Sequence, residues 1–273
     1  MLTQEQIKFY DDNGYIVLHD VFTPDELKII QEEALVLRTP HRGHPDANVL
    51  EKDGETVRAA WAVEMDSEAC ARAYRLPRLL GPVRQLLGDD VYLHQSRLNY
   101  KAAGKGDIFQ WHQDYASWVH DGIPRGGHRD MLTVLVMLDE STTDNGPLRF
   151  VPGSHKHNLI ESFYDTVTTS YPLHIVPDEY MDKHFSKIPV VEMTGPSGTV
   201  VLFCGNLVHS SKENHSPDGR RNLYFAYNRD DNRPVREPSR KHKNKYIMSP
   251  TPFKLDYVSD RSLTEYAQGA HHV

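Results

Sequence analysis

Histidine and aspartate residues recur in this sequence at a spacing that could hold a metal ion. The chain contains 16 His, and the pattern His-x-Asp occurs at several places. Two His and one carboxylate with open coordination positions form the ligand set of non-haem Fe(II) oxygenases. In a sequence, this ligand set appears as a His-x-Asp pair with a distant second His. The surroundings of each pair must decide which pair can bind a metal ion. The pairs are His44/Asp46, His112/Asp114 and His128/Asp130.

His112 and Asp114 have the most suitable surroundings. They follow Ile108–Trp111, which we predict to be a short strand. A spacing of two on an extended segment places both side chains on one face, where they can share one ion. We therefore favour this pair as metal ligands.

The other two pairs have simpler explanations. His44 and Asp46 lie in a segment with Pro and Gly but no periodicity, Pro40–Glu55, which we expect to be a loop and a candidate active-site lid. A loop of this kind does not fix ligand geometry. His128 follows Gly126-Gly127 and precedes an apolar run, so it is explained as a polar residue at the start of a buried strand.

The distant histidine is best supplied by His209, which we expect at the end of a strand that begins near Thr199. The alternative is His155 in a Pro-Gly-Ser-His turn, a less rigid platform for a ligand. Arg220 follows His209 by 11 residues, just before the predicted strand Leu223–Tyr227. Its planar guanidinium could bind a co-substrate carboxylate through two parallel hydrogen bonds. A lone arginine in a turn is usually solvated. Because Arg220 follows the His/Asp/His set, however, it supports a co-substrate site beside the metal.

Several ordered motifs resemble the phytanoyl-CoA dioxygenase family of Fe(II)/2-oxoglutarate-dependent oxygenases. The resemblance runs from Phe9 to about Asn228. It rests on His112-Gln-Asp114, Asn145-Gly-Pro-Leu148 with Val151-Pro-Gly-Ser-His155, and His209 with Arg220. The ectoine hydroxylase branch is the most similar, through His94–Lys101, Phe109–Asp114, Trp118 and Asp121–Arg125.

This resemblance implies a role for each matching residue. It implies that His112, Asp114 and His209 bind Fe(II), and that Arg220 binds the distal carboxylate of 2-oxoglutarate. The other co-substrate contacts that it implies are Ser211, Asn99, Gln95 and Phe109. The positions that match substrate contacts are Arg97, Trp118, Phe203 and Tyr224. With O₂ as the second co-substrate, the implied reaction hydroxylates an unactivated C–H bond and releases succinate and CO₂.

One departure from the ectoine branch concerns the substrate. The pattern Ser-Asp-Phe-Glu-Thr-Trp of those enzymes is replaced here by residues 113–118, so that Ala116 stands where they have an acidic residue. Arg97 and Trp118 would suit a carboxylate on a cationic or apolar body. The expected substrate is therefore a free amino acid, an ectoine-like zwitterion or a natural-product intermediate.

Three alternatives stay open at this point. The same oxidant could perform desaturation or cyclisation in secondary metabolism. A zinc hydrolase could use the same three ligands to activate water, but it would have no need of Arg220, Asn99 or Ser211. A non-catalytic cupin-like binding protein should tolerate the loss of Asp114.

The remaining pattern predicts a mainly β chain with flanking helices around a double-stranded β-helix (jelly roll, cupin-like) core. We predict a single domain over residues 1–273, with a mostly helical part at 1–90, the jelly-roll core at 91–230 and a solvated wrap at 231–273. Helices are expected after Thr3, after the capping box Thr23-Pro24-Asp-Glu26, and over Ala69–Leu87 with a break near Pro77 and Pro82. The strands expected in the core are Val91–Lys101, Ile108–Trp111, Met131–Leu138, Leu148–Val151, Pro189–Met193, Thr199–Phe203 and Leu223–Tyr227.

Composition narrows the class of protein. Against 38 Asp and Glu stand 31 Lys and Arg, a net charge of −7, which argues against a nucleic-acid or acidic-membrane partner. Two cysteines exclude a disulfide framework, an iron–sulfur site and a Cys-rich zinc site. No apolar run approaches the ~20 residues that span a bilayer, and residues 1–20 do not resemble a signal peptide. We expect a soluble, cytoplasmic enzyme acting on a small molecule, and leave open whether it forms a homodimer.

Overall fold

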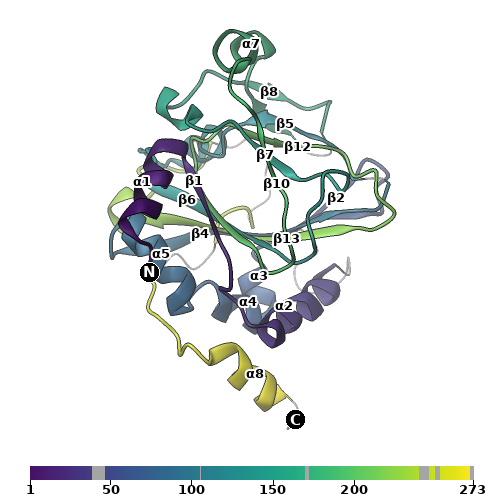
Figure 1. The fold of residues 1–273 in the computed structure, drawn as a ribbon, viewed down its shortest axis with the longest axis vertical. Coiled ribbons are helices and arrows are strands. Elements are labelled where there is room, and N and C mark those ends of the chain that lie inside the picture. Colours follow the sequence, from purple (N-terminus) through teal and green to yellow (C-terminus); the bar gives the residue numbers. More distant parts are fainter. Residues whose placement is uncertain (39–46, 105, 170–171, 240–245, 250–252, 271–273) are drawn as a thin grey trace.

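Two antiparallel β-sheets face each other, and helices cover the outer side of the larger sheet (Figure 1). The computed structural model describes residues 1–38, 47–104, 106–169, 172–239, 246–249 and 253–270. In spatial order, the larger sheet contains β1 (Tyr15–Leu18), β11 (Val200–Cys204), β6 (Met131–Met137), β13 (Arg220–Arg229), β4 (Val91–Lys101), β3 (Val57–Trp61) and β2 (Asn48–Leu50). The smaller sheet contains β10 (Val191–Met193), β7 (Leu148–Phe150), β12 (His209–Ser211), β5 (Phe109–His112), β9 (Leu173–Ile175) and β8 (Phe163–Asp165).

The centre of the larger sheet is buried on both faces. Every residue of β6, Met-Leu-Thr-Val-Leu-Val-Met, is buried, as expected for a strand with helices on one side and a second sheet on the other. Between the sheets, the rings of Phe150 and Phe203 lie 5.1 Å apart. The prediction of a mainly β fold with flanking helices and a jelly-roll core is confirmed.

The first two helices begin where the sequence predicts. The helix α1 (Gln4–Asn13) begins after Thr3 and ends at Gly14, whose φ of 82° is a conformation that favours glycine. The helix α2 (Pro24–Leu37) has the predicted capping box, in which Thr23 accepts from the backbone of Glu26 and the Glu26 side chain accepts from that of Thr23.

The third predicted helical region is interrupted before Pro77 but not at Pro82. The structure has α3 (Val63–Asp66), α4 (Glu68–Ala73) and α5 (Pro77–Leu87). The predicted break near Pro77 and Pro82 is thus found at Pro77, whereas α5 continues through Pro82. The buried face of α5 packs on the sheet, and this packing outweighs the local cost of a missing backbone hydrogen bond. That face includes Leu79, Leu80, Val83, Leu86 and Leu87.

The first and last parts of the chain are more ordered than predicted. Within the expected loop Pro40–Glu55, Asn48–Leu50 forms β2 and pairs with β3, while residues 39–46, with His44 and Asp46, lie outside the described residues. In the expected C-terminal wrap, α8 (Ser262–Ala270) contacts α2 and α4, and Leu263 is 0% exposed. Figure 1 shows α2, α4, α5 and α8 together on the side of the larger sheet that faces away from the smaller one.

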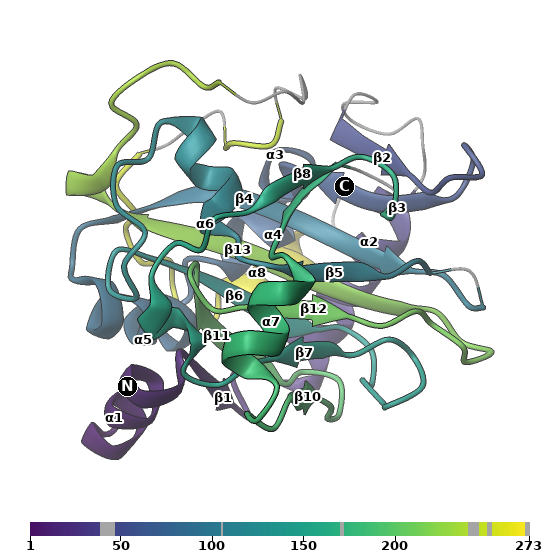
Figure 2. The ribbon, with the colours of Figure 1, turned by 90° about the horizontal axis from the view of Figure 1, so that it is seen from above.

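The smaller sheet carries elements that the sequence pattern did not predict. The strands β8, β9 and β12 have three residues each, too short for a periodic signal. The helix α7 (Asp178–Phe185) lies over the outer face of this sheet (Figure 2), where Phe185 packs with Val151 and Val208. Other short helices among the described residues are α6 (Tyr115–Trp118), η2 (Val119–Asp121), η3 (Ser154–His157) and η4 (Asp230–Asn232). Among the described residues, no helix combines the length and the apolar character needed to cross a membrane.

Candidate active site

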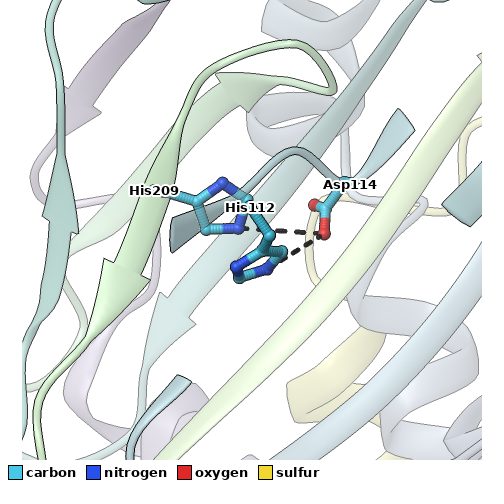
Figure 3. Close-up of side chains that lie close together, drawn as sticks. All are labelled: His112, Asp114 and His209. Carbon is cyan, nitrogen blue, oxygen red and sulfur yellow. Dashed lines mark ion pairs between the residues drawn. The ribbon is translucent and has the colours of Figure 1, made fainter. Parts of the chain in front are cut away.

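The side chains of His112, Asp114 and His209 meet between the sheets (Figure 3). Asp114 Oδ1 lies 3.9 Å from His112 Nε2 and 3.8 Å from His209 Nε2. All three side chains are buried, and their ligand atoms lie within 4.8 Å of one another. In the described part of the chain, this is the only such group of His, Cys, Asp or Glu.

Strand pairing brings the two histidines together. His209 on β12 is the register partner of His112 on β5, and their ring centroids are 4.0 Å apart. The prediction that His209 ends a strand is wrong, because β11 ends at Cys204 and His209 begins β12. A turn at Gly205 separates the two strands, and a Cβ there would lie 2.6 Å from Trp118 Cζ3. Glycine at this position therefore allows Trp118 to approach the backbone.

Asp114 reaches the cluster by a different route from the predicted one. The strand β5 ends at His112, and Asp114 has helical backbone angles (φ −57°, ψ −39°) at the start of α6. The turn is held by Tyr115 N, which donates to Gly205 O at 2.9 Å, and by Gln113 Nε2, which donates to Asn206 O at 2.6 Å. The predicted reason, two residues on one extended face, is thus wrong although the side chains do converge.

The histidines present the correct nitrogen to a metal ion. Nδ1 of His112 lies 2.7 Å from the carbonyl oxygen of Gln110, and Nδ1 of His209 lies 2.9 Å from that of Leu207. A carbonyl oxygen only accepts, so Nδ1 carries the proton and the Nε2 lone pair faces Asp114. Burial and the neighbouring His209 lower the pKa of His112 to about 3, and burial lowers the pKa of His209. Both rings are therefore neutral, the form that binds metals.

Asp114 is held as a carboxylate. Burial alone would raise its pKa, but the neighbouring side chains of His209, Arg97 and His112 and a hydrogen bond from Thr133 lower it. Thr133 Oγ1 donates to Asp114 Oδ2 at 3.0 Å, which directs Oδ1 toward the histidines. Two neutral imidazoles and one carboxylate are a donor set that fits Fe(II).

The cluster lies in a cavity that Arg220 also lines. Arg220 begins β13 and is 3% exposed. Its Nε donates to Asn145 O at 3.3 Å and its Nη2 to Gly146 O at 2.8 Å, whereas Nη1 is buried without a hydrogen-bond partner among the described residues. Asn99 Oδ1, in the same cavity wall, is also buried without one. Since buried polar atoms are nearly always paired, these two atoms indicate a missing polar ligand, and Nη1 fits a carboxylate.

A lysine that the sequence analysis did not select lies beside Arg220. Lys101 on β4 is the register partner of Arg220, and its Nζ donates to Ser211 Oγ at 2.8 Å. Burial and the charge of Arg220 lower the pKa of Lys101 well below its ordinary value. A signal for it exists in the sequence, since polar residues alternate along β4 and share one face of the strand. These residues are Gln95, Arg97, Asn99 and Lys101.

The other implied co-substrate residues also line the cavity. Gln95 Oε1 accepts a hydrogen bond from Trp118 Nε1 at 3.1 Å. The ring centroids of Phe109 and His112 lie 6.1 Å apart. The guanidinium carbon of Arg58 lies 4.0 Å from the centroid of the Phe109 ring. Arg58 had not been selected, because β3 was not predicted.

Of the four implied substrate residues, three line the cavity. These are Arg97, Trp118 and Tyr224. Phe203 does not, because its buried ring packs between Phe150, at 5.1 Å, and His209, also at 5.1 Å. Phe203 thus supports the position of His209 from behind.

The histidines set aside in the sequence analysis lie elsewhere. His128 is partly exposed, with Nε2 3.3 Å from Asp11 Oδ1. His155 is buried, with Nε2 3.1 Å from the Asp11 carbonyl oxygen. Two histidines that had no predicted role, His120 and His174, line the cavity with their rings stacked at 4.6 Å.

Comparison with known proteins gives a consistent result. The family model described as phytanoyl-CoA dioxygenase (PhyH) matches residues 10–222. The chain is 36% identical over 240 residues to the ectoine dioxygenase of Sphingopyxis alaskensis, covering 85% of this chain and 78% of the relative. It is 35% identical over 247 residues to the L-proline trans-4-hydroxylase of Streptomyces griseoviridis, covering 84% and 88%.

A solved structure agrees with these sequence matches. The crystal structure of EctD from S. alaskensis with 2-oxoglutarate and 5-hydroxyectoine superposes with a TM-score of 0.80 at 34% identity, covering 94% of this chain and 88% of that one. The family match spans more than half of the chain, and both relatives are similar over most of their length. The chain therefore belongs to the phytanoyl-CoA dioxygenase family.

Proposed function

We propose that this member of the family hydroxylates an unactivated C–H bond of a small zwitterionic molecule that carries a carboxylate. It is an Fe(II)- and 2-oxoglutarate-dependent dioxygenase, which consumes O₂ and releases succinate and CO₂. The observation that carries the proposal is the buried cluster of His112, Asp114 and His209 beside a buried arginine with an unpartnered Nη1. When bound, iron supplies the oxidising chemistry, and the protein supplies binding and orientation.

We assign the three clustered side chains as the iron ligands. His112 and His209 would bind through Nε2, since each Nδ1 donates to a backbone carbonyl. Asp114 would bind through Oδ1, since Oδ2 accepts from Thr133. Three protein ligands leave positions for the co-substrates, which a closed structural zinc site would not.

We assign Arg220 as the residue that binds the distal carboxylate of 2-oxoglutarate. Its free Nη1 supports this role, and Ser211 and Asn99 line the same part of the cavity. We assign Phe109 and Gln95 to the walls that hold the co-substrate, Gln95 through its contact with Trp118. A zinc hydrolase would gain nothing from a buried arginine that points an unused donor into its cavity, so this feature favours the oxygenase.

We assign Arg97, Trp118 and Tyr224 to the substrate. Arg97 offers a cation for a carboxylate, and the aromatic rings offer apolar faces for a compact ring or a cationic body. Two relatives are named for ectoine and L-proline, both small cyclic zwitterions. We therefore take ectoine and L-proline as the first probes. We do not assume that ectoine is the substrate, because Ala116 stands where the ectoine branch has an acidic residue.

The test is anaerobic addition of Fe(II) and 2-oxoglutarate to the protein, followed by the visible charge-transfer band of the chelate. We expect a band in the wild-type protein, a strongly reduced band in His209→Ala and Arg220→Ala, and an unchanged band in the control His128→Ala. Absence of the band from folded wild-type protein, or its persistence in both variants, would contradict the proposal. Succinate release with ectoine, L-proline and other amino acids then identifies the substrate.

We also propose that residues 1–273 form one domain and that the enzyme works in the cytoplasm. Packing of α8 on α2 and α4 supports a single folded unit. Both cysteines, Cys70 and Cys204, are free and buried, which suits a reducing compartment.

A further inference from the structure

We propose that the indole N–H of Trp61 donates a hydrogen bond to the substrate carboxylate that Arg97 also binds. Trp61 would then be a substrate-binding residue that the sequence motifs do not include. The inference rests on the proposed function, because it takes the substrate to be a carboxylate.

Trp61, Arg97 and Tyr224 form a row across three neighbouring strands. Trp61 ends β3 and is the register partner of Arg97 on β4, and Arg97 is in turn the register partner of Tyr224 on β13. The guanidinium carbon of Arg97 lies 5.2 Å from the Trp61 ring centroid and 4.7 Å from the Tyr224 ring centroid. All three side chains line the cavity that contains the metal cluster. The two rings thus flank the cation and restrict how it can turn.

Trp61 carries a donor for which no described residue supplies an acceptor. The residue is 5% exposed, and its Nε1 is buried without a hydrogen-bond partner among the described residues. A buried tryptophan N–H normally finds an acceptor, because leaving it unpaired costs free energy. Val49 and Ile247, which pack with the indole ring, line the same cavity. An acceptor can therefore come from a molecule in the cavity.

Trp118 provides the contrast within the same cavity. Its Nε1 donates to Gln95 Oε1 at 3.1 Å, so its donor is already satisfied by the protein. Of these two cavity tryptophans, Trp61 alone is left to bind a ligand through its N–H.

The neighbour of this donor indicates the chemistry of the acceptor. Arg97 Nη2 lies 4.0 Å from Asp114 Oδ1, close enough for charge attraction but too far for a hydrogen bond. A carboxylate has two oxygens and can accept from the guanidinium and from the indole at once. Such binding would fix the substrate beside the metal cluster at a defined angle, since Arg97 lies next to Asp114.

The first test is Trp61→Phe, which removes the N–H but keeps an aromatic ring against Arg97. We expect the KM of the better of the two probes, ectoine or L-proline, to rise about tenfold, with the Kd of 2-oxoglutarate unchanged. The matched control is Trp111→Phe, since Trp111 packs with residues under α7 and is not part of the cavity wall. An unchanged KM in Trp61→Phe, or an equal rise in Trp111→Phe, overturns the inference.

The second test needs no turnover. The chain has 3 Trp, so the zinc-loaded enzyme with 2-oxoglutarate gives few indole N–H resonances, and the one lost in Trp61→Phe belongs to Trp61. Acetate, ectoine and L-proline are then titrated, acetate being a minimal carboxylate. We expect a downfield shift of the Trp61 resonance, and a resonance that none of the three moves overturns the inference. If neither ectoine nor L-proline supports succinate release, the proposed substrate class fails, but the acetate titration still decides the hydrogen bond.

Discussion

Two walls of the cavity are built in different ways. The strand wall, defined by Asn99, Ser211 and Arg220, comes from β4, β12 and β13 in the interior of the two sheets. The edge wall, defined by His120, Tyr164 and His174, comes from η2 and from β8 and β9 at the edge of the smaller sheet. Three of the residues we assign to co-substrate binding define the strand wall, while His120 of the edge wall follows the substrate-side residue Trp118 by two positions in the chain. Co-substrate binding thus rests on strands that have a partner on each side, whereas part of the substrate side rests on the edge of the smaller sheet.

The difference has a physical cause. The strand β13 pairs with β4 from Arg220 to Arg229 and with β6 from Asn222 to Asn228, so moving Arg220 would disturb the end of this ladder. By contrast, β8 and β9 have three residues each, and β8 has a pairing partner on one side only. Edge elements can change sequence without disturbing the core. Substrate selectivity can therefore vary in these elements at low cost in stability.

Removal of a metal ligand should have the largest effect. His112→Ala is expected to lower succinate formation by on the order of a thousandfold and to abolish stoichiometric Fe(II) binding, more than the loss of an outer partner of a ligand would. Metal content and succinate release measure both effects. His128→Ala is the control, because His128 contacts Asp11 and not the cluster. Full iron content in His112→Ala would contradict our ligand assignment.

Loss of the strand-wall cation should come next. Arg220→Leu is expected to raise the Kd of 2-oxoglutarate about a hundredfold, since a carboxylate would lose a charge-assisted hydrogen bond in a buried site. The variant should also lose its preference for 2-oxoglutarate over 2-oxopentanoate, which lacks the distal carboxylate. Arg221→Leu is the matched control, because Arg221 pairs with Asp139 at 2.6 Å. An unchanged preference in Arg220→Leu would show that Arg220 does not bind this group.

Loss of the hydrogen bond that orients the Asp114 carboxylate should have a smaller effect on Fe(II) affinity. Thr133→Val keeps the shape of the side chain but removes the hydrogen bond to Asp114 Oδ2. We expect Fe(II) affinity to fall roughly tenfold, with restoration in Thr133→Ser. Competition with a chelator gives the affinity directly. If the serine variant were no better than the valine variant, the hydroxyl would have no orienting role.

The strand wall could be predicted from the sequence to a greater extent than the edge wall. The motif around His112 and Asp114, with His209 and Arg220 far along the chain, was enough to select residues that the structure brings to one cavity. Its geometry was not predictable in the same way, because the turn into α6 and the start of β12 depend on contacts between distant segments. Asp114 therefore converges with the histidines for a reason different from the one expected.

The residues of the edge wall could not be predicted from the sequence pattern. His120 and His174 are far apart in the sequence and meet only because β9 pairs with β5. Trp61 was missed for a related reason, since all five residues of β3 are buried and show no alternation that would mark a strand. Unlike these residues, Lys101 could have been selected from the sequence, because it alternates with Arg97 and Asn99 along one predicted strand.

The smallest effect should come from the edge wall itself. His174 stacks on His120 and lies 5.0 Å from the Tyr164 ring, so His174→Ala removes one face of the wall on β9, the strand next to the edge of the smaller sheet. We expect a change of about two- to fivefold in the ratio of kcat/KM for ectoine and L-proline, since the loss of such a ring contact is worth about 0.5–1 kcal/mol. The Kd of 2-oxoglutarate and the iron affinity should not change. His184→Ala on α7, outside this cavity, is the control. A loss of 2-oxoglutarate binding in His174→Ala would mean that the two walls are coupled, and the division of chemistry from selectivity would not hold.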